Sequence, residues 1–93
     1  MFIKLNRINK HLSGEFYISE IRVNASQILF ITENEQIRMT LSEGAPSLGL
    51  NSMVRFSDVL FASTTGRETI TVVGEPALIE SKIKSSNKQL LRG

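Results

Sequence analysis

Apolar and polar residues alternate along much of the chain up to residue 73, as they do in strands with one buried face. The clearest case is 37–41, where Ile37, Met39 and Leu41 are separated by single polar residues. The segment 28–31 is instead wholly apolar, which is typical of a central strand buried on both faces. The pattern predicts about six strands, with the approximate ranges 3–7, 16–23, 27–32, 37–41, 53–62 and 68–73.

One predicted strand changes its buried face partway along. Phe16 and Ile18 share one face of an extended chain, whereas Ile21 and Val23 share the other. An extra residue would switch the faces in this way, so we expect a bulge or bend near 19–20.

The period changes after residue 73. Proline is tolerated at the first helical position, so Pro76 is suited to start a helix. Ile79 and Ile83 then fall on one helical face. We expect the helix to run from about Pro76 to Ser85. The basic tail 86–93 either continues it or stays flexible.

These patterns predict one mostly β domain over residues 1–85. A chain of 93 residues is too short for two self-sufficient cores. We expect a small antiparallel β-barrel or strongly bent sheet, SH3-like or a β-roll, of about six strands with one C-terminal α-helix. The helix would cover an opening or an edge of the sheet. The expected core positions are Ile3, Leu5, Ile18, Val23, Ile28, Phe30, Ile37, Met39, Leu41, Val54, Phe56, Val59, Phe61, Ile70, Val72, Ile79 and Ile83.

Four leucines fall outside the strand and helix periods. Leu48 and Leu50 lie in a loop rich in glycine and serine, and Leu90 and Leu91 lie in the tail. The loop leucines either pack beneath the sheet or form an exposed contact. Exposed leucines that cluster are candidates for binding a protein partner or a second copy of the chain.

The composition contains little catalytic chemistry. The chain has no cysteine and one histidine, which excludes disulfides, thiolate metal sites and His clusters. His11 lies in a polar turn, and neither Ser26 nor Ser57 belongs to a nucleophile motif. Glu20 is the one acid within an apolar segment and the single candidate for a tuned carboxylate. We therefore expect neither an enzyme nor a cofactor or metal.

The chain also lacks the apolar segments that membranes require. No run approaches the roughly 18 apolar residues of a membrane span. The first residues do not form the long apolar region of a signal peptide. We expect a cytoplasmic protein without membrane insertion.

Positive charge is concentrated at the two ends of the chain. Residues 1–81 carry seven Lys/Arg and nine Asp/Glu, whereas residues 82–93 carry four Lys/Arg and no acid. Such clusters either solubilise a helix end or bind an acidic partner or nucleic acid. An outward tyrosine could add base stacking. The candidate nucleic-acid-binding residues are Lys4, Arg7, Lys10, Tyr17, Lys82, Lys84, Lys88 and Arg92.

The order of short motifs resembles that of the FlbD-type (swarming-motility) small flagellar proteins and of similar small phage and prophage β-proteins. The matching segments are Phe2-Ile-Lys-Leu-Asn-Arg7, Val23-Asn24 with Ile28, Ile37-Arg-Met-Thr-Leu41 with Gly44, and Ile70-Thr-Val-Val73 leading into Glu75-Pro-Ala-Leu-Ile-Glu-Ser-Lys-Ile83. The resemblance implies a compact β-domain with a C-terminal helix and a non-catalytic accessory role.

Two functional hypotheses follow. The first is a small non-catalytic protein-binding adaptor or regulator, encoded by a phage or other mobile element, that uses Leu48, Leu50, Leu90 and Leu91. The alternative is a nucleic-acid-binding protein that uses the basic C-terminal tail.

Overall fold

The computed structural model of the chain describes residues 2–40 and 54–92, and of these the side chains at 38, 40 and 86–92 lie outside the description. In chain order the elements are β1 (Phe2–Lys10), β2 (Phe16–Asn24), the 3-10 turn η1 (Ala25–Gln27), β3 (Ile28–Glu33), α1 (Glu35–Thr40), β4 (Phe56–Ser63), β5 (Gly66–Val73) and α2 (Pro76–Arg92).

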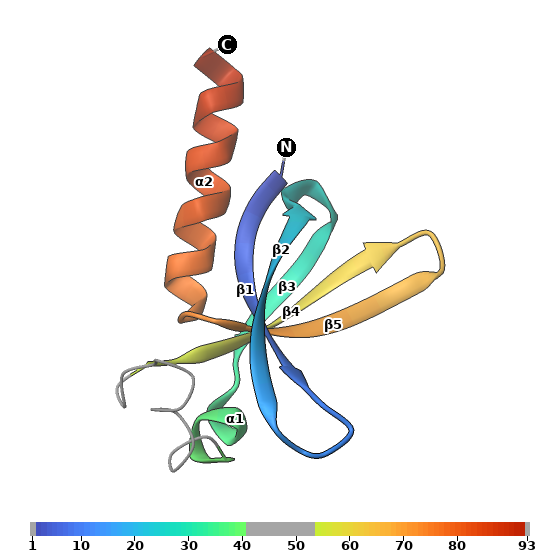
Figure 1. The fold of residues 1–93 in the computed structure, drawn as a ribbon. Helices are drawn as coiled ribbons and strands as arrows, with labels where there is room; N and C mark the ends of the chain where they lie inside the picture. Colours follow the sequence, from blue (N-terminus) through green and yellow to red (C-terminus); the bar gives the residue numbers. More distant parts are fainter. Residues whose placement is uncertain (1, 41–53, 93) are drawn as a thin grey trace.

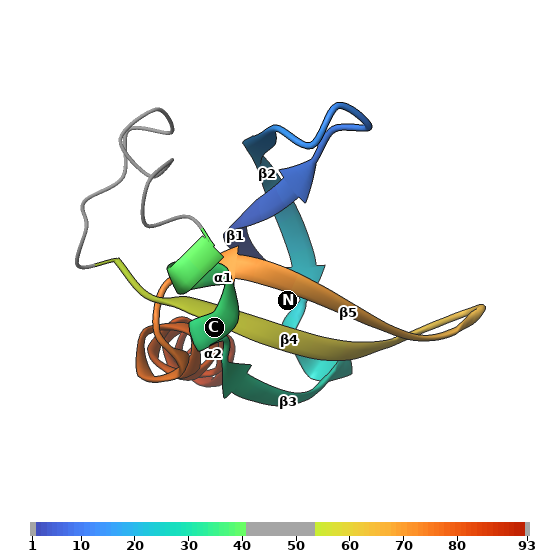
Figure 2. The same cartoon turned by 90° about the horizontal axis from the view of Figure 1, so that it is seen from below.

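The described strands form one antiparallel sheet in the order β2-β1-β5-β4-β3. Its two hairpins, β1–β2 and β4–β5, project in different directions (Figures 1 and 2), and α2 stands beside β1 (Figure 1). The prediction of a mostly β protein with a C-terminal helix is confirmed. The prediction of a barrel or strongly bent sheet of six strands is wrong, because the sheet has five strands and is neither closed nor strongly curled.

The core consists of two clusters on opposite faces of the sheet. The larger cluster lies beneath α2, and its buried members are Ile3, Leu5, Val23, Ala25, Val59, Ile70, Val72 and Ile79. The smaller cluster is built around Phe56 and Ile8, with Phe16, Ile18, Ile37, Val54 and Val73 packed against them. Most of the expected core positions are therefore buried or half-buried, and Ile8 is a core residue that the alternation missed.

The two clusters explain why the buried face changes within β2. The register between β1 and β2 is continuous from Phe2↔Asn24 to Lys10↔Phe16, so of the expected bulge or bend near 19–20 the bulge is wrong. The strand instead passes from the smaller cluster, at Phe16 and Ile18, to the larger one, at Ile21 and Val23, and each cluster buries its own face of the strand. The register shift occurs in β3, between Ile28 and Phe30.

Strand β3 lies at an edge of the sheet, which corrects its expected central position. Phe30, predicted to be in the core, is 54 % exposed, because nothing in the described chain covers that face of the edge strand. Ile31 points the other way and packs against the larger cluster.

The segment with the cleanest strand alternation is helical. The backbone N–H of Ile37 donates to Asn34 Oδ1 at 2.9 Å, so Asn34 caps the first turn of α1. The Asn34 amide in turn donates to both carboxylate oxygens of Asp58, at 3.0 and 3.1 Å. Met39, predicted to be buried, is consequently 76 % exposed, and Leu41 lies outside the described residues.

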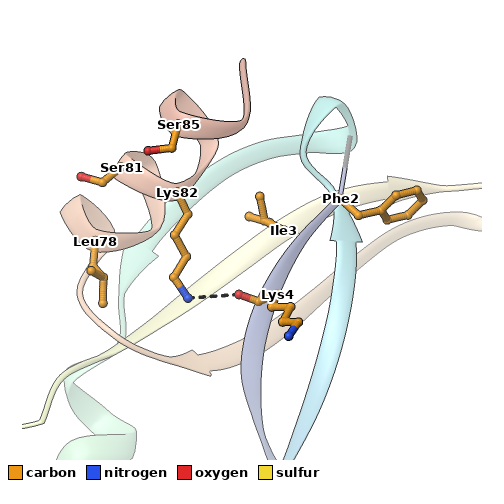
Figure 3. A pocket seen from close by; sticks show the side chains of 7 residues that line it. All are labelled: Phe2, Ile3, Lys4, Leu78, Ser81, Lys82 and Ser85. Carbon is orange, nitrogen blue, oxygen red and sulfur yellow. Dashed lines mark hydrogen bonds between the residues drawn. The ribbon is translucent and has the colours of Figure 1, made fainter. Parts of the chain in front are cut away.

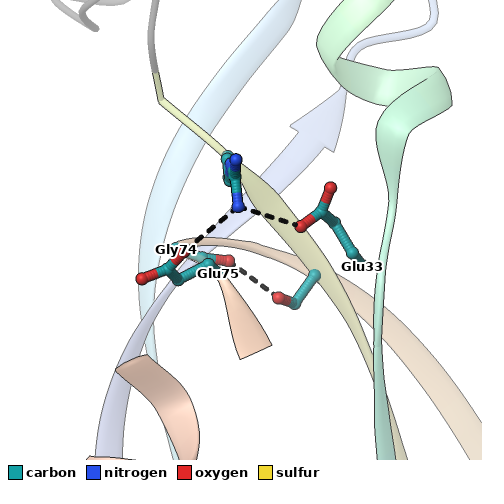
Figure 4. Close-up of polar contacts among 5 residues, drawn as sticks. Glu33, Gly74 and Glu75 are labelled. Carbon is teal, nitrogen blue, oxygen red and sulfur yellow. Dashed lines mark hydrogen bonds and ion pairs between the residues drawn. The ribbon is translucent and has the colours of Figure 1, made fainter. Parts of the chain in front are cut away.

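Gly74 and Glu75 form the joint between the sheet and α2. The helix begins at Pro76 as predicted and continues past Ser85 to Arg92. Gly74 has a φ of 118°, a conformation that glycine adopts without strain. The fully buried Ser57 hydroxyl donates to the Gly74 carbonyl at 2.7 Å. Figure 4 shows this joint beside Glu33 and Glu75, both of which pair with Arg55 Nη1, at 3.6 and 3.4 Å.

Candidate functional site

A groove of about 400 Å³ lies between β1 and α2. Its lining residues are Phe2, Ile3, Lys4, Leu78, Ser81, Lys82 and Ser85. In Figure 3, Lys82 reaches from α2 toward β1, Ile3 lies between the two elements, and Phe2 is turned away from the helix. The volume falls within the range of ligand sites in proteins.

The groove exists because β1 extends beyond its neighbour in the sheet. Strand β5 meets β1 at a single register position, Arg7↔Val72, and the chain leaves the sheet two residues later at Gly74. Residues 2–6 of β1 therefore pair with β2 on one side and with no described strand on the other. The first turns of α2 stand beside this unpaired stretch.

One face of α2 supplies the opposite wall. Leu78, Ser81, Lys82 and Ser85 follow the i, i+3, i+4, i+7 spacing of a single helical stripe. This stripe adjoins the one that packs on the sheet, in which Ile79 is 1 % exposed. Leu78, by contrast, is 49 % exposed.

Two lysines are among the residues that line the groove. Its described lining residues include Lys4 and Lys82 and no acid. Arg22 is the cross-strand neighbour of Lys4. Glu20 partly offsets this charge, since its carboxylate lies 3.5 Å from Lys4 Nζ. Glu20 is 54 % exposed, so it is not the buried carboxylate that a tuned acid would require.

A hydrogen bond crosses the groove. Lys82 Nζ donates to the backbone carbonyl oxygen of Lys4 at 3.1 Å. These two residues are far apart in the chain, and both are predicted nucleic-acid contacts. The structure thus brings one cation from each basic end of the sequence to the same place.

Other predicted cationic and aromatic candidates lie at the far end of β1. Lys10 Nζ lies 5.5 Å from the centre of the Phe16 ring, and Tyr17 stacks on His11 with ring centroids 4.1 Å apart. Lys10 lies six positions after Lys4 along the extended strand, a span of roughly 20 Å. The cations of β1 therefore do not form one continuous patch.

The structure describes some of the remaining predicted residues in full, others by their backbone alone and two not at all. Arg7 is half-buried between β2 and β5, and Lys84 is exposed on α2. Leu48 and Leu50 lie outside the described residues. The backbone of α2 includes four more candidates whose side chains also lie outside the description, namely Lys88, Leu90, Leu91 and Arg92.

A second pocket of about 320 Å³ lies where the β1–β2 hairpin approaches α1, and Lys10, Phe16 and Asn34 are among its lining residues. Asp58, which the sequence did not single out, accepts hydrogen bonds from Asn34 and from Thr71 Oγ1, the latter at 2.7 Å. The Asn34 amide, the Asp58 carboxylate and the Thr71 hydroxyl already hydrogen-bond to one another, so we assign these three groups a structural role.

The described part of the chain offers no grouping of three or more His, Asp or Glu that could hold a metal ion. Among the same residues, no helix is both long and apolar enough to cross a membrane. No family model, curated protein or solved structure matches the chain. The resemblance to FlbD-type proteins therefore stays a prediction.

Proposed function

We propose that the protein is a small non-catalytic protein-binding module and that the groove between β1 and α2 is its binding site. The observation that carries the proposal is the edge of β1 at residues 2–6, which pairs with no described strand and lies beside α2 (Figure 3). Exposed strand edges are common sites of association with another chain. The apolar side chain of Leu78 beside this edge adds contact area that a partner could bury.

The groove replaces the four leucines as the first surface to test. Partner binding remains the leading function, while its site moves to residues whose positions are described. An adaptor or regulator needs such a surface but no catalytic group.

The test is to fill the groove with a large side chain. Ser81 lines the groove, whereas Glu80 is exposed on the same helix and is not among the lining residues. We expect Ser81→Trp to lose proteins that the wild-type chain captures from a lysate of its own cell, and Glu80→Trp to retain them. A captured protein is then purified and titrated. Binding weakened at least about tenfold by Ser81→Trp supports the groove, because blocked core contacts typically cost that much or more. Equal binding by both variants, or no captured partner, contradicts the proposal.

Nucleic-acid binding is the second candidate, and the hairpin tip of β1 and β2 is the observation that favours it. Lys10, His11 and Tyr17 gather there, and Leu12 is fully exposed at the turn. Cations beside aromatic rings suit single-stranded nucleic acid. This candidate predicts binding of mixed-sequence single-stranded DNA that weakens with salt and on Lys10→Glu, but not on Lys84→Glu. Binding that ignores salt, or equal weakening by both variants, contradicts it.

A further inference from the structure

The free edge of β1 presents specific backbone groups to the groove. The His11 N–H donates to the Glu15 carbonyl at 2.7 Å, which marks this pair as hydrogen-bonded. The β1–β2 register continues from this pair without a shift. Odd-numbered residues of β1 therefore bond to β2, and even-numbered residues direct their N–H and C=O groups to the opposite side. Phe2 and Lys4 thus present theirs toward the groove.

The bond from Lys82 fits this geometry. Its ammonium donates to the Lys4 carbonyl, which is one of the groups directed away from β2. In a continuous sheet, a backbone N–H of the next strand would occupy that place. Lys82 therefore acts as a substitute for a missing strand, and its side chain is long enough to withdraw when a strand arrives.

The charges around the edge indicate what kind of strand would fit. A strand added beside β1 would direct alternate side chains toward α2, where Leu78 and Lys82 lie, and toward the opposite face, where Lys4 and Arg22 lie. Glu20 offsets one of these cations. Both faces of the incoming strand would thus meet a cation, which favours a segment rich in carboxylates.

We propose that the groove binds an extended acidic segment of a partner protein, which adds to β1 as an extra strand. This inference rests on the proposed function and specifies its ligand. A backbone N–H of the segment replaces Lys82 at the Lys4 carbonyl, and the freed ammonium pairs with a carboxylate of the segment. Backbone bonds provide affinity and the cations select for acidic side chains.

The test uses the full chain and a labelled nonapeptide in which Glu alternates with Val, with both ends blocked. We expect binding, measured by fluorescence anisotropy, together with slowed hydrogen exchange at the amides of Phe2 and Lys4. A Lys/Val peptide and a peptide N-methylated on alternate amides should each bind at least about tenfold more weakly, because one has the wrong charge and the other lacks strand donors.

Two charge reversals on α2 form the matched variant pair. Lys82→Glu and Lys84→Glu change the net charge equally, both side chains are exposed, and only Lys82 is among the lining residues. We expect Lys82→Glu to weaken binding of the Glu/Val peptide at least about tenfold, and Lys84→Glu to change that binding less than about twofold. Unchanged thermal midpoints would show that both variants fold.

Several outcomes would overturn the inference. They are absent binding, equal binding of the N-methylated peptide, or equal weakening by the two variants. Tighter binding of single-stranded DNA that Lys82→Glu removes would assign the groove to nucleic acid. A doubled mass in light scattering, with the Lys4 amide already protected, would assign the edge to a second copy. A partner lost on Ser81→Trp that leaves the Lys4 amide unprotected would keep the proposed function and reject strand addition.

Discussion

Gly74 is the position at which a single methyl group should most clearly disturb the joint between the sheet and α2. Its φ of 118° lies where side chains other than glycine are strained. An alanine Cβ there would also lie 3.1 Å from Leu78 Cδ2. Leu78 is 49 % exposed and can rotate away, so the backbone strain should dominate the cost.

The magnitude follows from two opposing contributions to the free energy of unfolding. Backbone strain at such a residue costs on the order of 1–3 kcal/mol. Alanine also lowers the entropy of the unfolded chain, which offsets about 0.4–1 kcal/mol. We therefore expect Gly74→Ala to lose about 1–2 kcal/mol. At about 4–8 °C per kcal/mol for a domain of this size, the thermal midpoint should fall by roughly 4–16 °C.

The assay is thermal and urea unfolding followed by circular dichroism. Gly66→Ala is a matched control that adds backbone strain without a side-chain contact, because Gly66 has a φ of 133° but no atom within 4 Å of an added Cβ. The double variant Gly74→Ala/Leu78→Ala removes the contact and keeps the strain. We expect Gly74→Ala to cost nearly the same free energy of unfolding in the Leu78→Ala background as in the wild-type chain, with a difference of less than about 0.5 kcal/mol. An unchanged midpoint for Gly74→Ala would refute the strain argument. If Gly74→Ala costs nothing once Leu78 is already alanine, the cost would be assigned to the contact with Leu78.

Three further predictions test the core, the cap of α1 and the ion pair at the groove. Leu5→Ala should lose about 2–5 kcal/mol in urea unfolding, because Leu5 is 2 % exposed within the larger cluster; a loss below about 1 kcal/mol would contradict its core position. Asn34→Ala should cost about 0.5–2 kcal/mol and speed hydrogen exchange in α1, since it removes the helix cap; unchanged exchange would argue against the cap. A double-mutant cycle on Lys4 and Glu20 should give less than about 1 kcal/mol of coupling, because both side chains are more than half exposed; a larger value would indicate an ordered pair.

The strands and most of the core could be predicted because burial acts on each strand separately. Ile3 and Leu5 alternate with polar residues and are buried, as are Ile70 and Val72. Even the change of face in β2 was visible in the sequence, although its cause was not. A continuous strand that serves two clusters gives the same pattern as a bulged strand over one cluster, and only the pairing register separates the two.

Residues 35–40 show where alternation fails. Ile37 and Met39 alternate like a strand, but Asn34 can cap a helix, and its amide is held by Asp58 from another strand. That distant partner cannot be read from local spacing. The short polar turn at 33–35 was the available signal, because asparagine is strongly preferred at helix caps.

The candidate groove was hidden from the sequence for a related reason. Counting charges singled out Lys4 and Lys82, but the sequence separates them almost by the length of the chain. They meet because β5 leaves the sheet at Gly74 while β1 continues past it. The Gly-Glu-Pro turn that starts α2 thus also creates the unpaired edge, and α2 returns along that edge with Lys82 facing it. A strand edge whose carbonyl is met by a lysine ammonium instead of a strand N–H is closed by a replaceable side chain, which makes it the first place at which to test for partner binding.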